Sequence, residues 1–517
     1  MGAMAKQDIT IYYTSDLHGH FYPTTYGDKT QRALGLFRCA PGFVKTPNTL
    51  VIDGGDTLQG SPFTAYCVKE LRSARPVAEI MNRCGYDVVT LGNHDFNYGA
   101  DYLREYLTQG NFACVCENLK DETGKSIFPR LVKVMENGLR VGIVGIVTDH
   151  VNIWEKPENL AGVQVTSPLE AAREALAALR QEADLTICIY HGGFERDLRT
   201  GRLLSSSGEN IAYQLCQELD FDILLTGHQH LSLPGRLLHG TFALQCADNG
   251  REYHRLEVSV QDGKPVIRSQ AVAAQAPPDP ELMQAFSGLE AQVQHWLDQS
   301  VGSLPYPLHT ASHLQMAACG SDIAKLFSDV QLRASGAQLS AVSLANEVMG
   351  FGESVTRRNI LASYPYSNTL MVLEITGATL RAAMERSAAY FALDARGCLT
   401  ISETFLLPKV EHYNYDYYAG VEYRMDVTKP VGERVVLLQY QGKPVQPTDV
   451  FSICMSNYRA SGAGGYEMYT GCRVLREIQR DMSDLIMEYF ERGLQKTLFQ
   501  RIPFQYEVRG GPLPCWN

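Results

Sequence analysis

The sequence predicts an α/β protein of two domains, and three observations support that prediction. The chain has 517 residues, which is more than one ordinary domain contains. Its composition, 45% hydrophobic and 20% charged, is that of a globular protein. In the first half of the chain, short apolar runs alternate with helical patterns, which is typical of a layered α/β domain.

Six apolar, β-branched runs in the first half each end in a short polar cluster, and we interpret them as buried strands. A helical pattern over Pro168–Glu182 lies between two of these runs. Ligands bind at the carboxyl ends of strands in such sheets, so the polar clusters mark a candidate site. The runs are ITIYYTSDLHGH from Ile9, TLVIDGGDT from Thr49, YDVVTLGNHD from Tyr86, LRVGIVGIVTDH from Leu139, LTICIYHGG from Leu185 and FDILLTGHQH from Phe221.

A change of pattern after residue 273 predicts the join between the domains. The stretch AQAPPDPEL interrupts the alternation, and MQAFSGLEAQVQHWLDQS predicts an amphipathic helix. The stretch GSDIAKLFSDVQLRASG predicts another helix that ends at a glycine. We therefore predict a first domain over residues 1–318, a linker helix over residues 319–336, and a second domain over residues 337–517 with strands and helices of its own.

Charge and composition exclude several classes of protein. The net charge of −11 argues against a nucleic-acid polymer as ligand, because binding to its backbone needs a basic surface. No apolar run of about 18 residues occurs, so no membrane span is expected. The 13 dispersed cysteines predict reduced thiols and a cytoplasmic location. The alternative is an exported, periplasmic or cell-surface protein whose signal peptide is missing here, since MGAMAKQDIT has no apolar core. The oligomeric state stays open.

The polar ends of five runs supply the ligands of a metal site. They offer carboxylate, imidazole and amide groups without thiolate, which suits Mn²⁺, Zn²⁺ or Fe²⁺ in a hydrolytic site. Asp-x-His and His-x-His each place two side chains on one side of an extended segment. Seven ligands are too many for one ion, so two ions about 3.5–4 Å apart that share one carboxylate are expected. The polar ends contribute Asp16, His18, Asp56, Asn93, His94, His191, His228 and His230 as candidates.

Each of these motifs also has a plainer interpretation. Asp-x-His is common in turns, GGDT could cap a helix, and His191 could be a hydrogen-bonded core histidine. Five polar clusters, each directly after a strand-like run, would rarely arise from packing alone. The set as a whole therefore favours the metal site.

The same motifs, D-x-H, GDT, GNHD, HGG and GHQH, resemble those of the calcineurin-like metallophosphoesterase family. In the second half, YPYSNTLMVLEITGATL, NYDYYAGVEYRMDVTKPVGERV and NYRASGAGGY resemble the C-terminal domain of 5'-nucleotidases. Together the two resemblances cover nearly the whole chain. They imply a four-layer αββα metallophosphoesterase sandwich, a linker helix and a 5'-nucleotidase-type α/β domain.

The resemblance also implies a mechanism with two divalent ions, which could be Mn²⁺, Zn²⁺, Co²⁺ or iron. Asp56 would bridge the ions, and a hydroxide between them would attack the phosphate. His94 would stabilise the transition state or protonate the leaving oxygen, and Asp95 would fix the loop. One ion would also use Asp16, His18 and His230, and the other would also use Asn93, His191 and His228.

Asn97 distinguishes two branches of this superfamily. In the 5'-nucleotidase and UDP-sugar hydrolase branch, an aspartate stands three residues after the site histidine. NHDFNYG and NYRASG instead resemble the 2',3'-cyclic-nucleotide 2'-phosphodiesterase/3'-nucleotidase branch. The stretch LANEVMGFGESVTRRN also lacks the Gly-Gly-Ile-Arg segment of the nucleotidase branch. Asn97 would orient His94, with capping of a turn as the alternative.

The second domain is expected to bind the base of a nucleotide. The family pattern favours Tyr415 and Tyr458 as the stacking rings, with Tyr418 as the rival for the first place. Stacking tolerates any base, so broad specificity is expected for a substrate between the domains. The alternative is that these tyrosines only pack within the fold.

The expected function is metal-dependent hydrolysis of 2',3'-cyclic nucleotides and 3'-nucleotides. Activity as a 5'-nucleotidase or UDP-sugar hydrolase is the nearest alternative. A non-catalytic nucleotide-binding protein is a further one.

Overall fold

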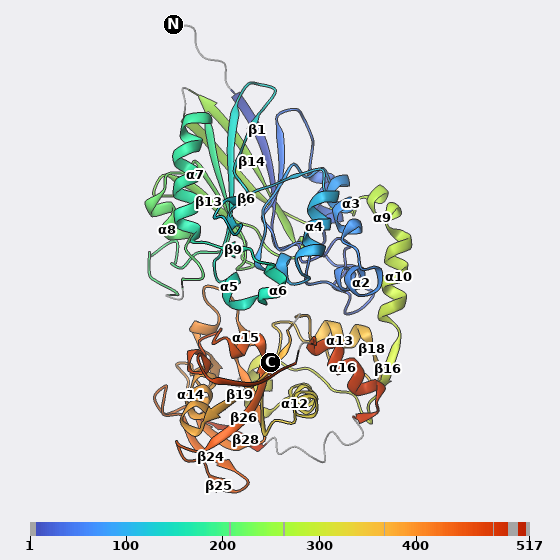
Figure 1. Ribbon diagram of the computed structural model, residues 1–517, viewed down its shortest axis with the longest axis vertical. Coiled ribbons are helices and arrows are strands. Elements are labelled where there is room, and N and C mark those ends of the chain that lie inside the picture. The colour runs from blue at the N-terminus through green and yellow to red at the C-terminus, as the bar shows by residue number, and fades with distance from the viewer. Residues whose placement is uncertain are drawn as a thin grey trace. The chain divides into compact units, whose positions relative to one another are not determined.

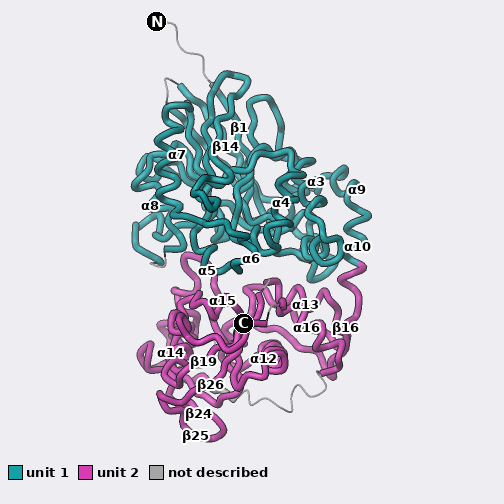
Figure 2. Tube along the Cα trace, in the orientation of Figure 1, with its two compact units in different colours: residues 1–294 teal, residues 295–517 magenta. Residues whose placement is uncertain are grey.

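The computed structural model describes residues 7–205, 208–261, 264–366, 368–478, 480–494 and 505–512. The chain forms two compact units, Met1–Gln294 and His295–Asn517 (Figure 2). The predicted linker segment lies within the second unit as helix α12 (Asp322–Ser335), which ends at Gly336 in a left-handed conformation. The predicted division of the chain at residues 318 and 336 stays a prediction.

The first unit is built on two six-stranded sheets whose central strands run parallel (Figure 1). One has the order β15 (Lys264–Ala273), β14 (Glu252–Gln261), β1 (Gln7–Thr14), β2 (Thr49–Asp53), β3 (Val88–Val89) and β4 (Ala113–Cys114). The other has the order β12 (Leu233–Leu238), β13 (Thr241–Gln245), β11 (Ile223–Thr226), β10 (Leu185–His191), β8 (Arg140–Val147) and β7 (Leu131–Val134).

The main core of this unit lies between the two sheets. Ile11 and Leu50 of the first sheet pack in one buried cluster with Ile143 and Ile187 of the second. The other face of the second sheet packs against α7 (Pro168–Glu182) and α8 (Ala212–Glu218). The remaining elements are α1 (Leu36–Cys39), α2 (Pro62–Tyr66), α3 (Arg75–Arg83), α4 (Ala100–Gln109), α5 (Val151–Trp154), α6 (Pro157–Leu160), α9 (Pro280–Ala285), and a small sheet of β6 (Ser126–Phe128), β5 (Cys116–Lys120) and β9 (Gln164–Val165).

Helix α7 shows how the sequence sets these boundaries. Ser167 caps its first turn by accepting a hydrogen bond from the Glu170 amide, and Pro168 occupies the first helical position. Small and apolar residues, including Ala172, Leu176 and Leu179, are buried at helical spacing. The predicted bounds of this helix are confirmed, as are the six predicted strands, although β3 has only two residues.

The helix expected from MQAFSGLEAQVQHWLDQS is interrupted. Helix α9 ends at Ala285, and α10 (Ser287–Leu297) begins after Phe286. The side chain of Phe286 is buried and stacks on Phe37 at a centroid distance of 6.1 Å. The apolar period continues through both helices, and for this reason the break could not be recognised in the sequence.

The second unit has a five-stranded mixed sheet. Its order is β22 (Asp416–Ala419), β17 (Leu339–Ser343), β26 (Val450–Ser456), β19 (Leu370–Thr376) and β27 (Arg473–Ile478). A four-stranded sheet has the order β25 (Lys443–Pro444), β24 (Val435–Tyr440), β23 (Glu422–Asp426) and β28 (Gln505–Arg509). The other elements are α11 (His313–Cys319), α13 (Arg357–Ser363), α14 (Gly377–Ala388), α15 (Asn457–Ala460), α16 (Met482–Glu491), and the strand pairs β16 (Ser300–Ser303) with β18 (Ser354–Thr356) and β20 (Phe391–Leu393) with β21 (Leu399–Ile401).

The described residues bear on two expectations from the sequence, the absence of a membrane span and the reduced state of the cysteines. None of the helices in the described ranges has the length and apolarity that a membrane span requires. The cysteines within the same ranges are free thiols, and most of them are buried.

Candidate metal centre

The predicted ligands lie at the carboxyl ends of strands from both sheets of the first unit. Two clusters form there, and within each cluster the possible ligand atoms lie within 4.8 Å of one another. Asp16 and His18 follow β1, Asp56 follows β2, His191 ends β10, and His228 and His230 follow β11. One cluster consists of Asp16, His18 and His230, and the other of Asp56, His191 and His228.

The backbone at these residues has an unusual conformation. Five of the seven predicted ligands have positive φ angles: Asp16 (54°), His18 (48°), Asp56 (57°), His228 (72°) and His230 (59°). Residues other than glycine adopt this left-handed region in only a few per cent of cases, Asp and His more often than most, and such residues cluster at functional sites. The strand ends therefore turn sharply enough to direct neighbouring side chains toward one place.

Three of the histidines are oriented by an oxygen acceptor behind the ring. His18 Nδ1 donates a hydrogen bond to the Gln59 carbonyl (2.8 Å), and His191 Nδ1 donates to the Gly54 carbonyl (2.7 Å). His228 Nε2 donates to the Glu209 carboxylate (2.7 Å). Histidines that bind metals almost always donate their second ring N–H to such an oxygen, which fixes the tautomer.

The opposite nitrogens of these rings face other electron-rich atoms. His228 Nδ1 lies 2.9 Å from Asn93 Oδ1, and His191 Nε2 lies 3.1 Å from Asp56 Oδ2. The Asp56 and His191 atoms are buried without a hydrogen-bond partner. Because the rings donate through their other nitrogens, the nitrogens that face Asn93 and Asp56 are the atoms that could bind a metal ion, which would displace any proton that they carry. Divalent metal ions take such lone-pair donors as ligands, so the residues fit the expected ions.

The electrostatics of the two clusters agree with this fit. Burial opposes protonation of His191, yet the Asp56 carboxylate raises the pKa of His191 to about 10. Burial also opposes ionisation of Asp56, but the His191 charge holds the pKa of that carboxyl well below its usual range. Burial lowers the pKa of His18 to about 4, so this ring is a neutral lone-pair donor at pH 7. The field that holds a proton on His191 also favours a divalent cation.

Asp95 holds the loop that carries the candidate ligands. Its carboxylate accepts hydrogen bonds from the backbone amides of Gly92, Asp56, Thr57 and Leu58, at 2.8–2.9 Å. The loops after β2 and β3 are thereby joined, and the expected loop-fixing role of Asp95 is confirmed.

A chain of hydrogen bonds runs behind His94. His94 Nδ1 donates to Asn97 Oδ1 (2.8 Å), and Asn97 Nδ2 donates to Glu155 Oε2 (2.6 Å). Asn159 Nδ2 donates to the second oxygen of Glu155 (2.7 Å). The rings of His94 and His18 are 5.4 Å apart, which places His94 beside the first cluster.

Glu155 and Glu209 could not be identified from the sequence. Neither residue follows a strand-like run. Glu155 contacts Asn97, 58 residues away along the chain, and Glu209 contacts His228, 19 residues away. Only the tertiary structure brings them together, so no local motif marks them.

The predicted base-stacking tyrosines have different surroundings. Tyr415 is only 2% exposed, its hydroxyl donates to the Ala317 carbonyl, and its ring lies 4.9 Å from those of Tyr390 and Tyr417. Tyr418, the rival, is 1% exposed. Tyr415 therefore has little exposed surface on which a base could stack, and its role stays a prediction.

Tyr458 is half-buried and therefore keeps part of its ring exposed. Its neighbour is Tyr413, also half-buried, at a centroid distance of 6.4 Å. The ring of Tyr366 lies 6.2 Å from that of Tyr413. A partly exposed aromatic group that includes Tyr413 and Tyr458 thus exists in the second unit.

Comparisons with known proteins agree with the two halves of the chain. Residues 9–232 match the family model of calcineurin-like phosphoesterases. Residues 306–471 match the model of the 5'-nucleotidase C-terminal domain.

Three relatives extend the similarity over nearly the whole chain. A crystal structure from Staphylococcus aureus, named as a possible 5'-nucleotidase and bound to α-ketoglutarate, is 30% identical with a TM-score of 0.90, and the match covers 97% of this chain and 100% of that one. The 2',3'-cyclic-nucleotide 2'-phosphodiesterase/3'-nucleotidase of Haemophilus influenzae is 28% identical over 89% of this chain and 81% of its own length. The trifunctional nucleotide phosphoesterase YfkN of Bacillus subtilis is 26% identical over 96% of this chain, which corresponds to only 38% of YfkN. The chain therefore belongs to the calcineurin-like phosphoesterases with a 5'-nucleotidase C-terminal domain, and it is a dimetal phosphoesterase.

Proposed function

We propose that this phosphoesterase hydrolyses 2',3'-cyclic nucleotides and 3'-nucleotides. The observation that carries the proposal is the amide of Asn97, in place of a carboxylate, on His94 Nδ1. The name of the Haemophilus influenzae relative supports the same substrates. The two reactions are sequential, because opening the cyclic phosphate at the 2' oxygen yields the 3'-nucleotide that the second reaction consumes.

The proposed ligand sets are the two clusters together with Asn93. Asp16, His18 and His230 would hold one ion, and Asn93, His191 and His228 would hold the other, with Asp56 shared. Bound divalent ions would lower the pKa of a water ligand from 15.7 to around 7 and neutralise charge on the phosphate oxygens. The ring nitrogens that face the clusters are already oriented by Gln59, Gly54 and Glu209, so little reorganisation is needed on binding.

His94 would protonate the leaving group. Its Nδ1–H donates to Asn97, which leaves Nε2 as the atom that can transfer a proton. As water oxygen bonds to phosphorus and the ester bond breaks, this proton would go to the ribose oxygen that leaves. The backbone amide of His94 donates to Asp56 Oδ1 (2.7 Å), which ties the acid to the shared carboxylate.

Glu155 would act as a positioning residue through Asn97. A side-chain amide can rotate by half a turn, and only one orientation presents its oxygen to His94 Nδ1–H. The hydrogen bond from Asn97 Nδ2 to the Glu155 carboxylate stabilises that orientation. The 5'-nucleotidase and UDP-sugar hydrolase branch has an aspartate at the position of Asn97. Glu155 would supply the corresponding carboxylate here, acting on His94 indirectly through Asn97.

Tyr458 and Tyr413 would supply the rings for the base. Stacking on an aromatic ring is worth about 1–3 kcal/mol per base and does not depend on base identity. Broad tolerance of bases is therefore expected. The expectation that the substrate lies between the domains stays a prediction.

Buried free thiols support the proposed cytoplasmic location, because such thiols persist in a reducing compartment. Fractionation of the native host, with detection of the chain in the cytoplasmic or the exported fraction, decides this point.

A panel of nucleotides tests the proposal. Phosphate release from 2',3'-cAMP (with a phosphomonoesterase-free assay of ring opening), 3'-AMP and 5'-AMP would be measured with Mn²⁺, Zn²⁺ and Co²⁺. We expect turnover of the first two substrates and little of 5'-AMP. Faster hydrolysis of 5'-AMP would instead identify a 5'-nucleotidase, which the similarity to the Staphylococcus aureus structure keeps as the second candidate. Tight nucleotide binding without turnover would indicate a binding protein.

A further inference from the structure

A third group of possible metal ligands lies outside the two clusters, at the end of β13 and the start of β14. Cys246 follows β13, and Glu252 and His254 occupy alternate positions on β14. Their possible ligand atoms, the thiol sulfur, a carboxylate oxygen and an imidazole nitrogen, lie within 4.8 Å of one another. The dimetal centre contains no thiol, so this group differs from it in chemistry.

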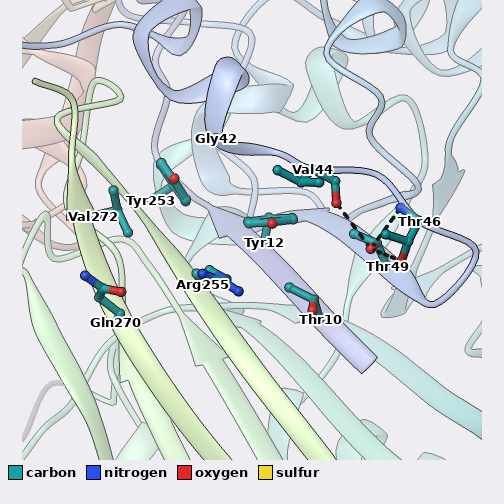
Figure 3. A pocket seen from close by; sticks show the side chains of 10 residues that line it. All are labelled: Thr10, Tyr12, Gly42, Val44, Thr46, Thr49, Tyr253, Arg255, Gln270 and Val272. Carbon is teal, nitrogen blue, oxygen red and sulfur yellow. Dashed lines mark hydrogen bonds between the residues drawn. The ribbon is translucent and has the colours of Figure 1, made fainter. Parts of the chain in front are cut away.

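The alternation along β14 explains why these side chains meet. Tyr253 and Arg255 line a cavity of about 460 Å³ on one face of the sheet (Figure 3). Because successive side chains of a strand point to opposite faces, Glu252 and His254 project together from the other face. Cys246, which is fully buried, meets them there.

The environment of His254 is the strongest indication that this group of side chains binds a ligand. It is 0% exposed, and neither ring nitrogen has a hydrogen-bond partner. Nε2 lies 3.3 Å from Glu252 Oε1, which is an ion-pair distance. A buried polar group without partners destabilises the folded state, and in native proteins such a group marks strain, a functional role, or a bound water or ion.

The carboxylate beside His254 is held in place. Glu252 accepts hydrogen bonds from the Ser232 hydroxyl (2.8 Å) and the Ala247 amide (3.2 Å). Burial opposes its ionisation, but the contacts with His254 and Ser232 keep the pKa of this carboxyl below its usual range. The hydrogen bonds that the Cys246 thiol donates are long, 3.6 Å to the Glu252 carbonyl and 3.9 Å to the Tyr13 carbonyl. Neither contact would be a serious loss if the thiol gave up its proton.

We propose that Cys246, Glu252 and His254 form a third, mononuclear site for a zinc-type divalent cation. Thiolate with imidazole favours Zn²⁺ or Co²⁺, whereas Mg²⁺ and Mn²⁺ prefer oxygen ligands. On binding, the sulfur–metal bond forms, the S–H bond breaks, and one proton passes to solvent. Three protein ligands leave a fourth position, and Ser232 and the partly exposed Glu252 mark the side from which water reaches it.

This site would fix the segment between its ligands. That segment contains Asp248, whose carboxylate lies 3.8 Å from His230 Nδ1 and accepts a hydrogen bond from Arg251. The third ion would thereby stabilise the loop behind one ligand of the dimetal centre without taking part in the reaction.

Cobalt spectroscopy tests the proposal without reference to nucleotide turnover. Metal-free protein would be loaded with Co²⁺ and measured for metal content and for a thiolate-to-cobalt charge-transfer band in the near ultraviolet. The predicted ligands of the dimetal centre include no thiolate, so only a cysteine site produces this band. We expect the band in the wild-type protein and its loss, with one bound ion fewer per chain, in Cys246→Ala. Cys216→Ala, which removes another buried thiol of the same unit, should keep both.

Absence of the band from cobalt-loaded wild-type protein would overturn the proposal, as would an unchanged band in Cys246→Ala. His254→Gln provides a second variant that keeps the thiol. It should weaken cobalt binding at this site and shift or remove the band, and an unaltered spectrum would also contradict the assignment. Because the readout is spectroscopic, inactivity on nucleotides cannot be mistaken for failure of the third site.

Discussion

The metal centre of the first unit and the aromatic group of the second unit place their side chains in different ways. At the candidate metal centre, the proposed ligands lie on or just after strand ends, and five of the seven have a left-handed backbone conformation. In the aromatic group, two tyrosines of the same segment differ in solvent exposure: Tyr413 is half-buried, whereas Tyr415 is buried. Ligand position thus follows from chain order, whereas ring exposure depends on packing from distant elements.

The largest expected effect comes from the shared carboxylate. Asp56→Asn should lose bound metal and lower kcat/KM by about 10⁴-fold or more, since a dimetal site loses its bridge and its charge. Metal content by elemental analysis and phosphate release measure the two effects together. Asp101→Asn, a change at an exposed carboxylate of the same unit, is the control. Normal metal content with normal activity in Asp56→Asn would show that the strand-end cluster is not the centre.

Removal of His94 should separate chemistry from metal binding. His94→Ala is expected to lower kcat by about 10²–10⁴-fold through loss of the proton donor. Metal content should stay at the wild-type value, because His94 is not among the proposed ligands. The exposed His239→Ala serves as control. A loss of metal in His94→Ala would instead assign this residue to the ligand set.

Glu155 tests whether a residue without a sequence motif belongs to the centre. Glu155→Ala should lower kcat by about 10–100-fold with little change in KM, as is usual when an orienting partner is removed. Glu155→Gln should recover part of the loss, because its amide oxygen can still accept from Asn97 Nδ2. The nearby exposed Glu158→Ala should be neutral. If both Glu155 variants change stability but leave kcat intact, the residue only holds its loop.

Alanine variants of Tyr458 and Tyr415 test whether an exposed ring contributes to nucleotide binding and a buried ring to stability. Tyr458→Ala should raise KM about 5- to 150-fold, which corresponds to a loss of roughly 1–3 kcal/mol of stacking, and Tyr458→Phe should behave as wild type. Tyr415→Ala should instead lower the free energy of unfolding by about 3–5 kcal/mol, as for other large buried aromatics, with an unchanged KM. Nucleotide kinetics and denaturant unfolding distinguish them. A raised KM confined to Tyr415→Ala would support the original prediction.

The sequence predicted the parts of the fold that depend on local patterns. The apolar runs became strands, and Pro168–Glu182 became a helix with its predicted bounds, because capping and apolar period agree there. The break at Phe286 was not predicted, since the period continues through it.

The candidate site was predictable to the same extent. The seven proposed ligands follow strand ends, so chain order alone grouped them. Glu155 and Glu209 come from loops whose neighbours carry no pattern, and the burial of Tyr415 depends on packing against residues such as Tyr390 that no local motif marks.

The left-handed strand ends have a consequence for protein supply in the cell. Each such residue costs about 1–3 kcal/mol. The five together then rival the folding free energy of about 5–15 kcal/mol that keeps an ordinary domain intact. Newly synthesised chains that find no ions would bear that cost without compensation and would be degraded preferentially. Starvation for divalent metal would thus reduce how much enzyme accumulates, in addition to how fast each molecule works.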